Sequence, residues 1–369
     1  MSMVYVGMGF MAFLSATTLA IDVGMFMTAR TQAQTSADSG ALAGAIALFF
    51  NDWNDRSSSG PAVQSALSAA RSNQVISATV SVTPPDVTFP LDPAGQPNRV
   101  KVDVFRTGAR GNPVPTLMGS LFGVQNADIV ATATAEASRA NAEKCVLPFT
   151  IPDRWREAST GQLSQPTDTY DPAAGDTYVP PGDKATYTGY DAARDKGMEI
   201  TLKANNTSKV TASFYNPWDL PGSVGGSDYR NNIDTCNPAL IHFNHDEYPP
   251  ENGNMVGPTK QGMDDLVNQD QGAYWDTSCN CIQGSKYANV MDSPRVARIP
   301  LYDPQVFLDG PAHGKNIDLS FVNMIGFFIE PLTGPGEVKG RIFPITGYYD
   351  KNAGPAPPGT FPVVIMLVQ

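Results

Sequence analysis

Hydrophobic residues are distributed unevenly along the chain, and the longest uncharged apolar stretch lies at its start. From Met3 to Ile21 no side chain carries a charge, and apolar residues continue past Asp22 until Arg30. A helix over 3–21 would be about 28 Å long, which is about the hydrocarbon thickness of a bilayer. Because the stretch is apolar on all sides, it is not typical of an amphipathic surface helix. The pattern predicts one long N-terminal helix with an unusually apolar first half.

Three interpretations of residues 3–21 are open: a buried core helix, a cleaved secretory signal, and an uncleaved membrane anchor. Its length favours an anchor, and the basic residues that usually precede the apolar core of a secretory signal are absent. No other segment is long enough for a second span, since the apolar run at 361–369 has the length of a buried strand. We therefore expect an inner-membrane anchor with most of the chain outside the cytoplasmic membrane.

Small side chains dominate the helical pattern that follows Arg30. They recur four residues apart, so they form narrow rows on one helix face, and such rows let another backbone approach closely. The rows contain Ala33, Ala37, Ala41 and Ala45, and beside them Ser36, Gly40 and Gly44. The face either packs on the protein's own sheet or packs against helices of other copies. The sequence leaves both interpretations open.

Asp22 is the one acid between Met3 and Arg30. A carboxylate inside an apolar segment is costly unless it has a partner or lies at the membrane–water boundary. Arg30 is about 12 Å further along a helix axis, which is too far for a direct pair within the helix. Asp22 therefore either marks the boundary or binds a group outside its own helix, such as the α-amine of a neighbouring subunit.

The remainder of the chain predicts a small α+β domain and then a β-rich domain with long loops. Within 51–140, residues 57–74 predict a short helix with Ser58 or Ser59 as its cap and Pro61 in its first turn. A second short helix is expected at 114–124, and alternating Val- and Thr-rich segments predict strands at 75–82, 98–106 and 127–137. Within 141–369, strands are expected at 145–152, 184–190, 198–204, 209–215, 295–302, 317–332, 338–349 and 361–369, with one helix at 257–270. The expected domains are thus 1–50, 51–140 and 141–369.

Composition narrows the classes of function. Only 17% of the residues are charged and the net charge is −11, without a basic stripe, so nucleic-acid binding is not expected. The four cysteines, Cys145, Cys236, Cys279 and Cys281, are an even number, which favours two disulfides in an exported chain; free thiols and a metal site are the alternatives.

Residues that could carry catalysis are scarce. Of the three histidines, His242 and His245 form an H-x-x-H in a segment before two prolines, and a polar loop is favoured there over a metal site. The chain has no nucleotide-binding or nucleophile-elbow motif. The sequence therefore predicts no cofactor, no metal and no enzymatic activity.

The N-terminal stretch "LAIDVGMFMTARTQAQTSADSGALAGA" resembles the TadG-like (TadE/TadG) proteins of putative Flp, or tight-adherence, pilus assembly. Asp22 and Gly24 match a D-x-G that follows the apolar helix, and Arg30 begins the polar turn after it. The alanine-rich stretch of the family corresponds to 37–45, with Ser39 and Gly40 as departures. The resemblance covers about residues 3–48.

This resemblance implies a structural subunit or accessory protein of a bacterial surface filament, held in membrane or filament core by its N-terminal helix. The implied partners are other copies or other pilus subunits, and the inner membrane before assembly. The residues expected to form the assembly helix surface are Asp22, Gly24, Arg30, Ala33, Ala37, Gly40, Ala41 and Gly44. The alternative is an envelope-anchored adhesin whose β-rich domain recognises its target, with exposed aromatic residues in "YNPWDLPG" and "GAYWD" as contacts.

Overall fold

The computed structural model describes residues 2–51, 54–93, 95–182, 186–244, 246–310, 318–331, 334, 336–357 and 359–368, and it leaves out the side chains of 2, 12, 14, 15, 18, 19 and 121. Its contacts divide the chain into two compact units. Unit 1 comprises Met1–Ser138 and Ile365–Gln369, and unit 2 comprises Arg139–Val364. The protein is therefore a mixed α+β chain with a long N-terminal helix and a β-rich body, as the sequence predicts.

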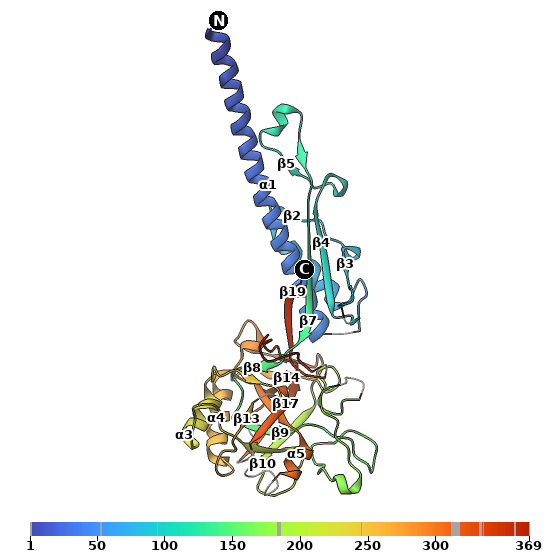
Figure 1. Cartoon of the computed structure of the whole chain (residues 1–369), viewed down its shortest axis with the longest axis vertical. Coiled ribbons are helices and arrows are strands. Elements are labelled where there is room, and N and C mark those ends of the chain that lie inside the picture. The colour runs from blue at the N-terminus through green and yellow to red at the C-terminus, as the bar shows by residue number, and fades with distance from the viewer. Residues whose placement is uncertain are drawn as a thin grey trace. The chain divides into compact units, whose positions relative to one another are not determined.

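Unit 1 is built on the long helix α1 (Ser2–Phe50), drawn in blue in Figure 1. Its C-terminal half lies against α2 (Pro61–Ser72) and against a four-stranded sheet with the order β19-β7-β4-β3. These strands are β3 (Val87–Thr88), β4 (Arg99–Arg106), β7 (Ile129–Arg139) and β19 (Val363–Val368). Two hairpins complete the unit: β1 (Gln74–Val75) with β2 (Ala78–Thr79), and β5 (Val114–Pro115) with β6 (Asn126–Ala127).

The sheet of unit 1 shows why its sequence forms strands. β4 and β7 pair antiparallel, and every second residue of β4 is buried, including Val100, Val102 and Val104. On β7 the buried positions are alanines, so a helix can approach closely. The core of the unit is thus made of valines on the sheet and alanines on both helices.

Three local predictions for unit 1 differ from the structure. The expected strand 75–82 is interrupted after Val75, because Ile76 and Ser77 adopt positive φ angles and turn the chain into the β1–β2 hairpin. The expected helix 114–124 is a hairpin whose loop contains a four-residue 3₁₀ helix, η3 (Gly119–Phe122). Gly60 rather than Ser58 or Ser59 is the N-cap of α2, while Pro61 does occupy the first turn.

Unit 2 contains a closed sheet of six strands with a seventh at its side. The ring follows the order β17-β16-β9-β11-β10-β18, and β18 pairs back with Gly326–Ile329 of β17. β13 pairs with Leu319 and Ser320 at the start of β17. The ring strands are β9 (Phe149–Pro152), β10 (Glu199–Ala204), β11 (Phe214–Pro217), β16 (Val296–Tyr302), β17 (Leu319–Ile329) and β18 (Glu337–Phe343). Pairing is parallel between β9 and β16 and between β10 and β11, and antiparallel elsewhere in the ring.

Shorter elements surround the ring. The helices are α3 (Gly226–Asp234), α4 (Val256–Gln269) and α5 (Pro304–Asp309). The short strands are β8 (Ala142–Glu143), β12 (Ile241–His242), β13 (Glu247–Tyr248), β14 (Tyr274–Asp276) and β15 (Cys281–Gln283). The expected helix 257–270 is α4, whereas the expected strand 184–190 is not formed over its described part, 186–190.

Aromatic side chains form much of the core of unit 2. Trp218 packs edge-on against Phe321 with 4.5 Å between ring centroids, and Tyr248 stacks on Phe321. Trp218 and Tyr215, which belong to the "YNPWDLPG" segment, are buried. Because they are buried, Trp218 and Tyr215 cannot serve as surface contacts of an adhesin. Tyr274 of "GAYWD" is exposed.

Candidate assembly surface on the N-terminal helix

The small-residue rows of α1 are buried inside unit 1. Ala33, Ala37 and Ala41 are at most 1% exposed. A Cβ atom built on Gly44 would lie 2.8 Å from Val100 Cγ1 and 3.1 Å from Ala66 Cβ, and Gly40 is similarly close to α2 and β4. The two helices can approach this closely only because neither has larger side chains at the contact.

Polar contacts fix the same packing. The buried Ser36 hydroxyl donates to the Ala70 carbonyl at 2.7 Å, joining α1 to the last turn of α2. The Gln32 side chain accepts from the Ile76 N–H at 2.8 Å, in the turn that follows α2. The small-residue face is thus packed within the chain, which was one of its two interpretations, and packing against other copies stays a prediction.

Asp22 is bound to a segment almost a hundred residues away. It is 6% exposed, and its carboxylate accepts the N–H groups of Leu117 at 2.9 Å, Met118 at 3.1 Å and Gly119 at 2.6 Å. These amides open η3, so the carboxylate occupies the position of a helix N-cap ligand. Arg30 and Gly24, the neighbouring family positions, are exposed, and nothing lies within 4 Å of a Cβ built on Gly24.

The three amides also set the charge state of Asp22. Burial raises the pKa of the carboxyl group, but the N–H donors of Met118, Leu117 and Gly119 outweigh it, and the net pKa is lowered. A depressed carboxyl pKa adds stability that is present above the unfolded-state value of about 3.9 and is lost as the pH falls through the folded-state value. Asp22 therefore holds the 114–127 hairpin on α1 at neutral pH.

Replacing Asp22 with Ala is expected to release this hairpin. The amides of Leu117, Met118 and Gly119 lose their acceptor, so their hydrogen exchange should accelerate roughly tenfold or more. Asp128→Ala serves as control because Asp128 accepts one N–H, from Gly108, elsewhere in unit 1. Unchanged exchange at 117–119 would show that Asp22 does not hold the hairpin.

The first half of α1 carries apolar side chains that are exposed. Met3 is 90% exposed, Val6 72% and Phe10 63%, and there is open space around Gly7 and Gly9. In Figure 1 this half of the helix extends beyond the strands of unit 1. The exposed apolar side chains on it are Met3, Val4, Tyr5, Val6, Met8, Phe10, Met11, Phe13, Ile21, Val23 and Met27. We call these residues the apolar helix surface.

The hairpin loop fixed by Asp22 adds to the exposed apolar area of unit 1. Leu117, Phe122 and Val124 are all more than half exposed, and η3 contacts α1. Monomeric proteins rarely expose a contiguous apolar patch of this kind without a function in association.

In the part of the chain that the structure describes, no helix is both long and apolar enough to cross a bilayer, so the expected membrane-spanning helix is not supported.

Comparison with known families identifies the segment that carries this surface. Residues 1–47 match the family model of putative Flp pilus-assembly TadE/G-like proteins. The N-terminal helix is TadE/G-like. The match confirms the resemblance found in the sequence and supports a pilus-associated role in general. No curated protein and no solved structure matches the chain significantly.

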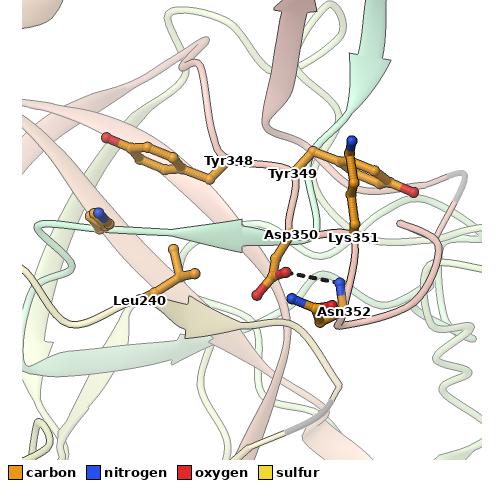
Figure 2. A pocket seen from close by; sticks show the side chains of 7 residues that line it. Leu240, Tyr348, Tyr349, Asp350, Lys351 and Asn352 are labelled. Carbon is orange, nitrogen blue, oxygen red and sulfur yellow. Dashed lines mark hydrogen bonds between the residues drawn. The ribbon is translucent and has the colours of Figure 1, made fainter.

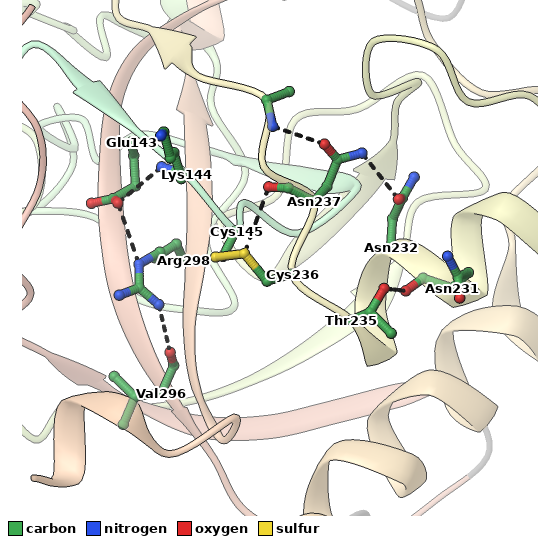
Figure 3. Close-up of a disulfide and its surroundings, with 11 residues drawn as sticks. Glu143, Lys144, Cys145, Asn231, Asn232, Thr235, Cys236, Asn237, Val296 and Arg298 are labelled. Carbon is green, nitrogen blue, oxygen red and sulfur yellow. Dashed lines mark hydrogen bonds and ion pairs between the residues drawn. A yellow bond between two sulfur atoms is a disulfide. The ribbon is translucent and has the colours of Figure 1, made fainter.

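Outside the TadE/G-like helix, the four cysteines form two disulfides in unit 2. Cys145 is bonded to Cys236, which joins the segment before β9 to the segment that follows α3 (Figure 3). The Cys145 N–H donates to the Asn237 carbonyl at 3.1 Å, so backbone pairing accompanies this link. Cys279, in the loop between β14 and β15, is bonded to Cys281, the first residue of β15.

The histidine segment of unit 2 forms an ion-pair cluster. His242 Nδ1 lies 2.9 Å from Asp246 and its Nε2 lies 3.1 Å from Asp350. Burial lowers the His242 pKa, but the two carboxylates outweigh it and raise the net pKa. His245 and His313 lie outside the described residues, and within those residues no group of three or more His, Cys, Asp or Glu is placed to hold a metal ion.

A shallow pocket of about 390 Å³ lies beside this cluster. Figure 2 shows Tyr348 and Tyr349 projecting at its rim above Leu240 and Asp350. The Lys144 ammonium lies 5.1 Å from the Tyr348 ring centroid. The TadE/G-like match ends at residue 47 and therefore assigns no role to this pocket.

Proposed function

We propose that the protein is a structural or accessory subunit of a Tad/Flp-type pilus system at the bacterial cell envelope. In this role the apolar helix surface is buried against apolar helices of other copies or of other pilus subunits. The observation that supports the proposal is the division of α1 into two halves. One half is packed within unit 1, and the other exposes apolar side chains on a segment that matches a pilus-assembly family.

The energetics favour association through this surface. Complete burial of a single Val, Met or Phe side chain contributes about 1.5–3 kcal/mol. The apolar helix surface has more than five such side chains, so their burial would contribute on the order of 10 kcal/mol before the entropy of association is subtracted. Asp22 fixes the position of the 114–127 hairpin beside the C-terminal end of this surface. The family match suggests a non-enzymatic role, and the proposal needs no catalytic residue.

Charging the apolar helix surface tests the proposal. The double variant Val6→Glu, Phe10→Glu places two carboxylates on one helix face, because the positions are four residues apart. The wild-type protein is expected to form large assemblies without detergent, and the variant to elute as a monomer in light-scattering chromatography. The assemblies of the wild type are expected to be regular filaments in electron micrographs.

A matched control separates this effect from general changes in charge. Leu91→Glu, Val224→Glu introduces the same charges at exposed apolar positions outside α1, and should leave assembly unchanged. Equal behaviour of both double variants would contradict the proposal. Detergent-bound wild-type monomers would instead favour the second candidate, an envelope adhesin, for which the pocket between Tyr348 and Tyr349 is the supporting observation.

A further inference from the structure

The two disulfides of unit 2 differ in what they can contribute to stability. Cys145 and Cys236 are 91 residues apart, whereas Cys279 and Cys281 are separated by two positions. A disulfide stabilises mainly by restricting the unfolded chain, and the effect grows with the length of the closed loop. The Cys279–Cys281 bond closes the shorter of the two loops, so it restricts the unfolded chain less and adds less stability than Cys145–Cys236.

The loop that holds this second disulfide is already fixed by other contacts. β14 and β15 pair antiparallel in the register Tyr274–Gln283, Trp275–Ile282 and Asp276–Cys281. The Asp276 carboxylate accepts the Ser278 N–H at 2.8 Å and the Ser278 hydroxyl at 2.6 Å, which caps the turn. The hairpin thus has a closed ladder and a capped turn that do not depend on the sulfur–sulfur bond.

The second disulfide faces a hydrogen-bond donor. Cys279 is exposed and Cys281 is half-buried, and the same holds for Cys236 and Cys145, so the donor and not the exposure distinguishes the two disulfides. The Gln283 side-chain amide Nε2 lies 3.2 Å from Cys281 Sγ and 3.8 Å from Cys279 Sγ. Gln283 is two residues after Cys281 on β15, so both side chains project from the same face of the strand.

We propose that Cys279–Cys281 is a thiol–disulfide exchange site, with Gln283 as the positioning residue that stabilises the leaving thiolate. The substrate class is a thiol, either of a small molecule or of a dithiol protein. Exposed disulfides are the ones that exchange readily, and exchange needs access to one sulfur and a stabilised leaving group at the other. Cys279 offers the access, and the amide beside Cys281 offers the stabilisation.

The exchange balances without any further reactant. A thiolate of the substrate attacks Cys279 Sγ and forms a mixed disulfide, while the Cys279–Cys281 bond breaks and its electron pair leaves on Cys281 Sγ. The Gln283 N–H donates to this thiolate, which then takes a proton from water. A second substrate thiolate attacks the mixed disulfide, releases Cys279 as a thiolate and forms the substrate disulfide. The substrate is oxidised by two electrons and the protein is reduced.

Graded reduction of the folded, full-length protein tests the site. One arm uses reduced glutathione and the other a reduced Cys-x-x-Cys oxidoreductase, followed by thiol alkylation and peptide mass analysis. Cys279 and Cys281 are expected to be alkylated at a thiol concentration roughly tenfold or more below that needed for Cys145 and Cys236. Unchanged near-UV circular dichroism would show that the chain stays folded. Reaction in one arm only would identify the source of the thiol.

Variants of Gln283 separate a positioning role from a structural one. Gln283→Leu should slow the exchange roughly tenfold and shift alkylation of the reduced Cys281 thiol to higher pH, because the thiolate loses its donor. Gln271→Leu, at an exposed glutamine that follows α4, should leave both unchanged. Simultaneous reduction of both disulfides in both arms, or the same pH profile in Gln283→Leu and wild type, would overturn the proposal.

Discussion

Gly44→Val is expected to lower the free energy of unfolding of unit 1 by about 3 kcal/mol or more. The first added carbon would lie 2.8 Å from Val100 Cγ1 and 3.1 Å from Ala66 Cβ, closer than van der Waals contact allows. Relief would require α1 to move away from α2 and β4 together, because all three elements meet at this position. Urea unfolding followed by far-UV circular dichroism measures the loss.

The matched control for this prediction is on the same helix. Gly24→Val makes the same chemical change where nothing lies within 4 Å of the added Cβ. Valine has a helix propensity no worse than that of glycine, so this variant should be as stable as the wild type or slightly more stable. Equal destabilisation by both variants would mean that the α1–α2 contact does not depend on the small side chain at residue 44.

Unit 2 is expected to lose stability as the pH rises from about 4.5 to 7. Glu143 is 1% exposed, its Oε2 has no hydrogen-bond donor among the described residues, and Arg298 Nε lies 3.4 Å from Oε1 (Figure 3). Burial outweighs the attraction of Arg298 and raises the Glu143 pKa to about 7. The folded state then holds a proton that the unfolded state has released, so stability is greatest below the unfolded pKa of about 4.5.

The raised pKa of Glu143 determines how much stability unit 2 can lose as the pH rises. The rise of the Glu143 pKa from 4.5 to about 7 corresponds to roughly 3–4 kcal/mol at most between pH 4.5 and 8. His242 acts in the same direction, since its raised pKa adds stability that is lost as the pH rises through the folded value. Glu143→Gln should reduce the dependence of unfolding free energy on pH but not remove it, because burial also raises the pKa of Asp153 to about 6 and that of Asp219 to about 7. Glu247→Gln, at an exposed position, should leave the dependence unchanged. A profile that rises with pH in the wild type would contradict the prediction.

Periodicity in the sequence was sufficient to predict the elements that have one clear face. The alternation of valines in β4 and the four-residue spacing of alanines in α1 both correspond to buried positions. The sequence does not predict helix α3, because the "SVGGSD" segment at its start is typical of a turn. The sequence feature that indicates this helix is the spacing of Tyr229 and Ile233, which are four residues apart and both buried.

Partners distant in the chain could not be predicted in this way. The charge of Asp22 within an apolar segment is visible in the sequence, but the amides that bind it belong to a hairpin 95–97 residues later. Backbone donors do not appear in a side-chain pattern. The strand predicted at 361–369 is confirmed as β19. Its sequence does not indicate that β19 pairs with β7 rather than with a strand of unit 2. Pairing depends on topology, which one sequence does not contain.

The return of β19 to the sheet of unit 1 makes unit 2 an insertion between two neighbouring strands rather than a C-terminal extension. Any truncation that ends the chain soon after Ser138 also removes β19, and β7 then becomes an edge strand whose unpaired backbone groups can bind other chains. Isolating unit 1 would therefore require an internal excision with a short linker joining β7 to β19. The same topology makes unit 2 exchangeable: a different insert at this junction would leave the helix and its sheet complete.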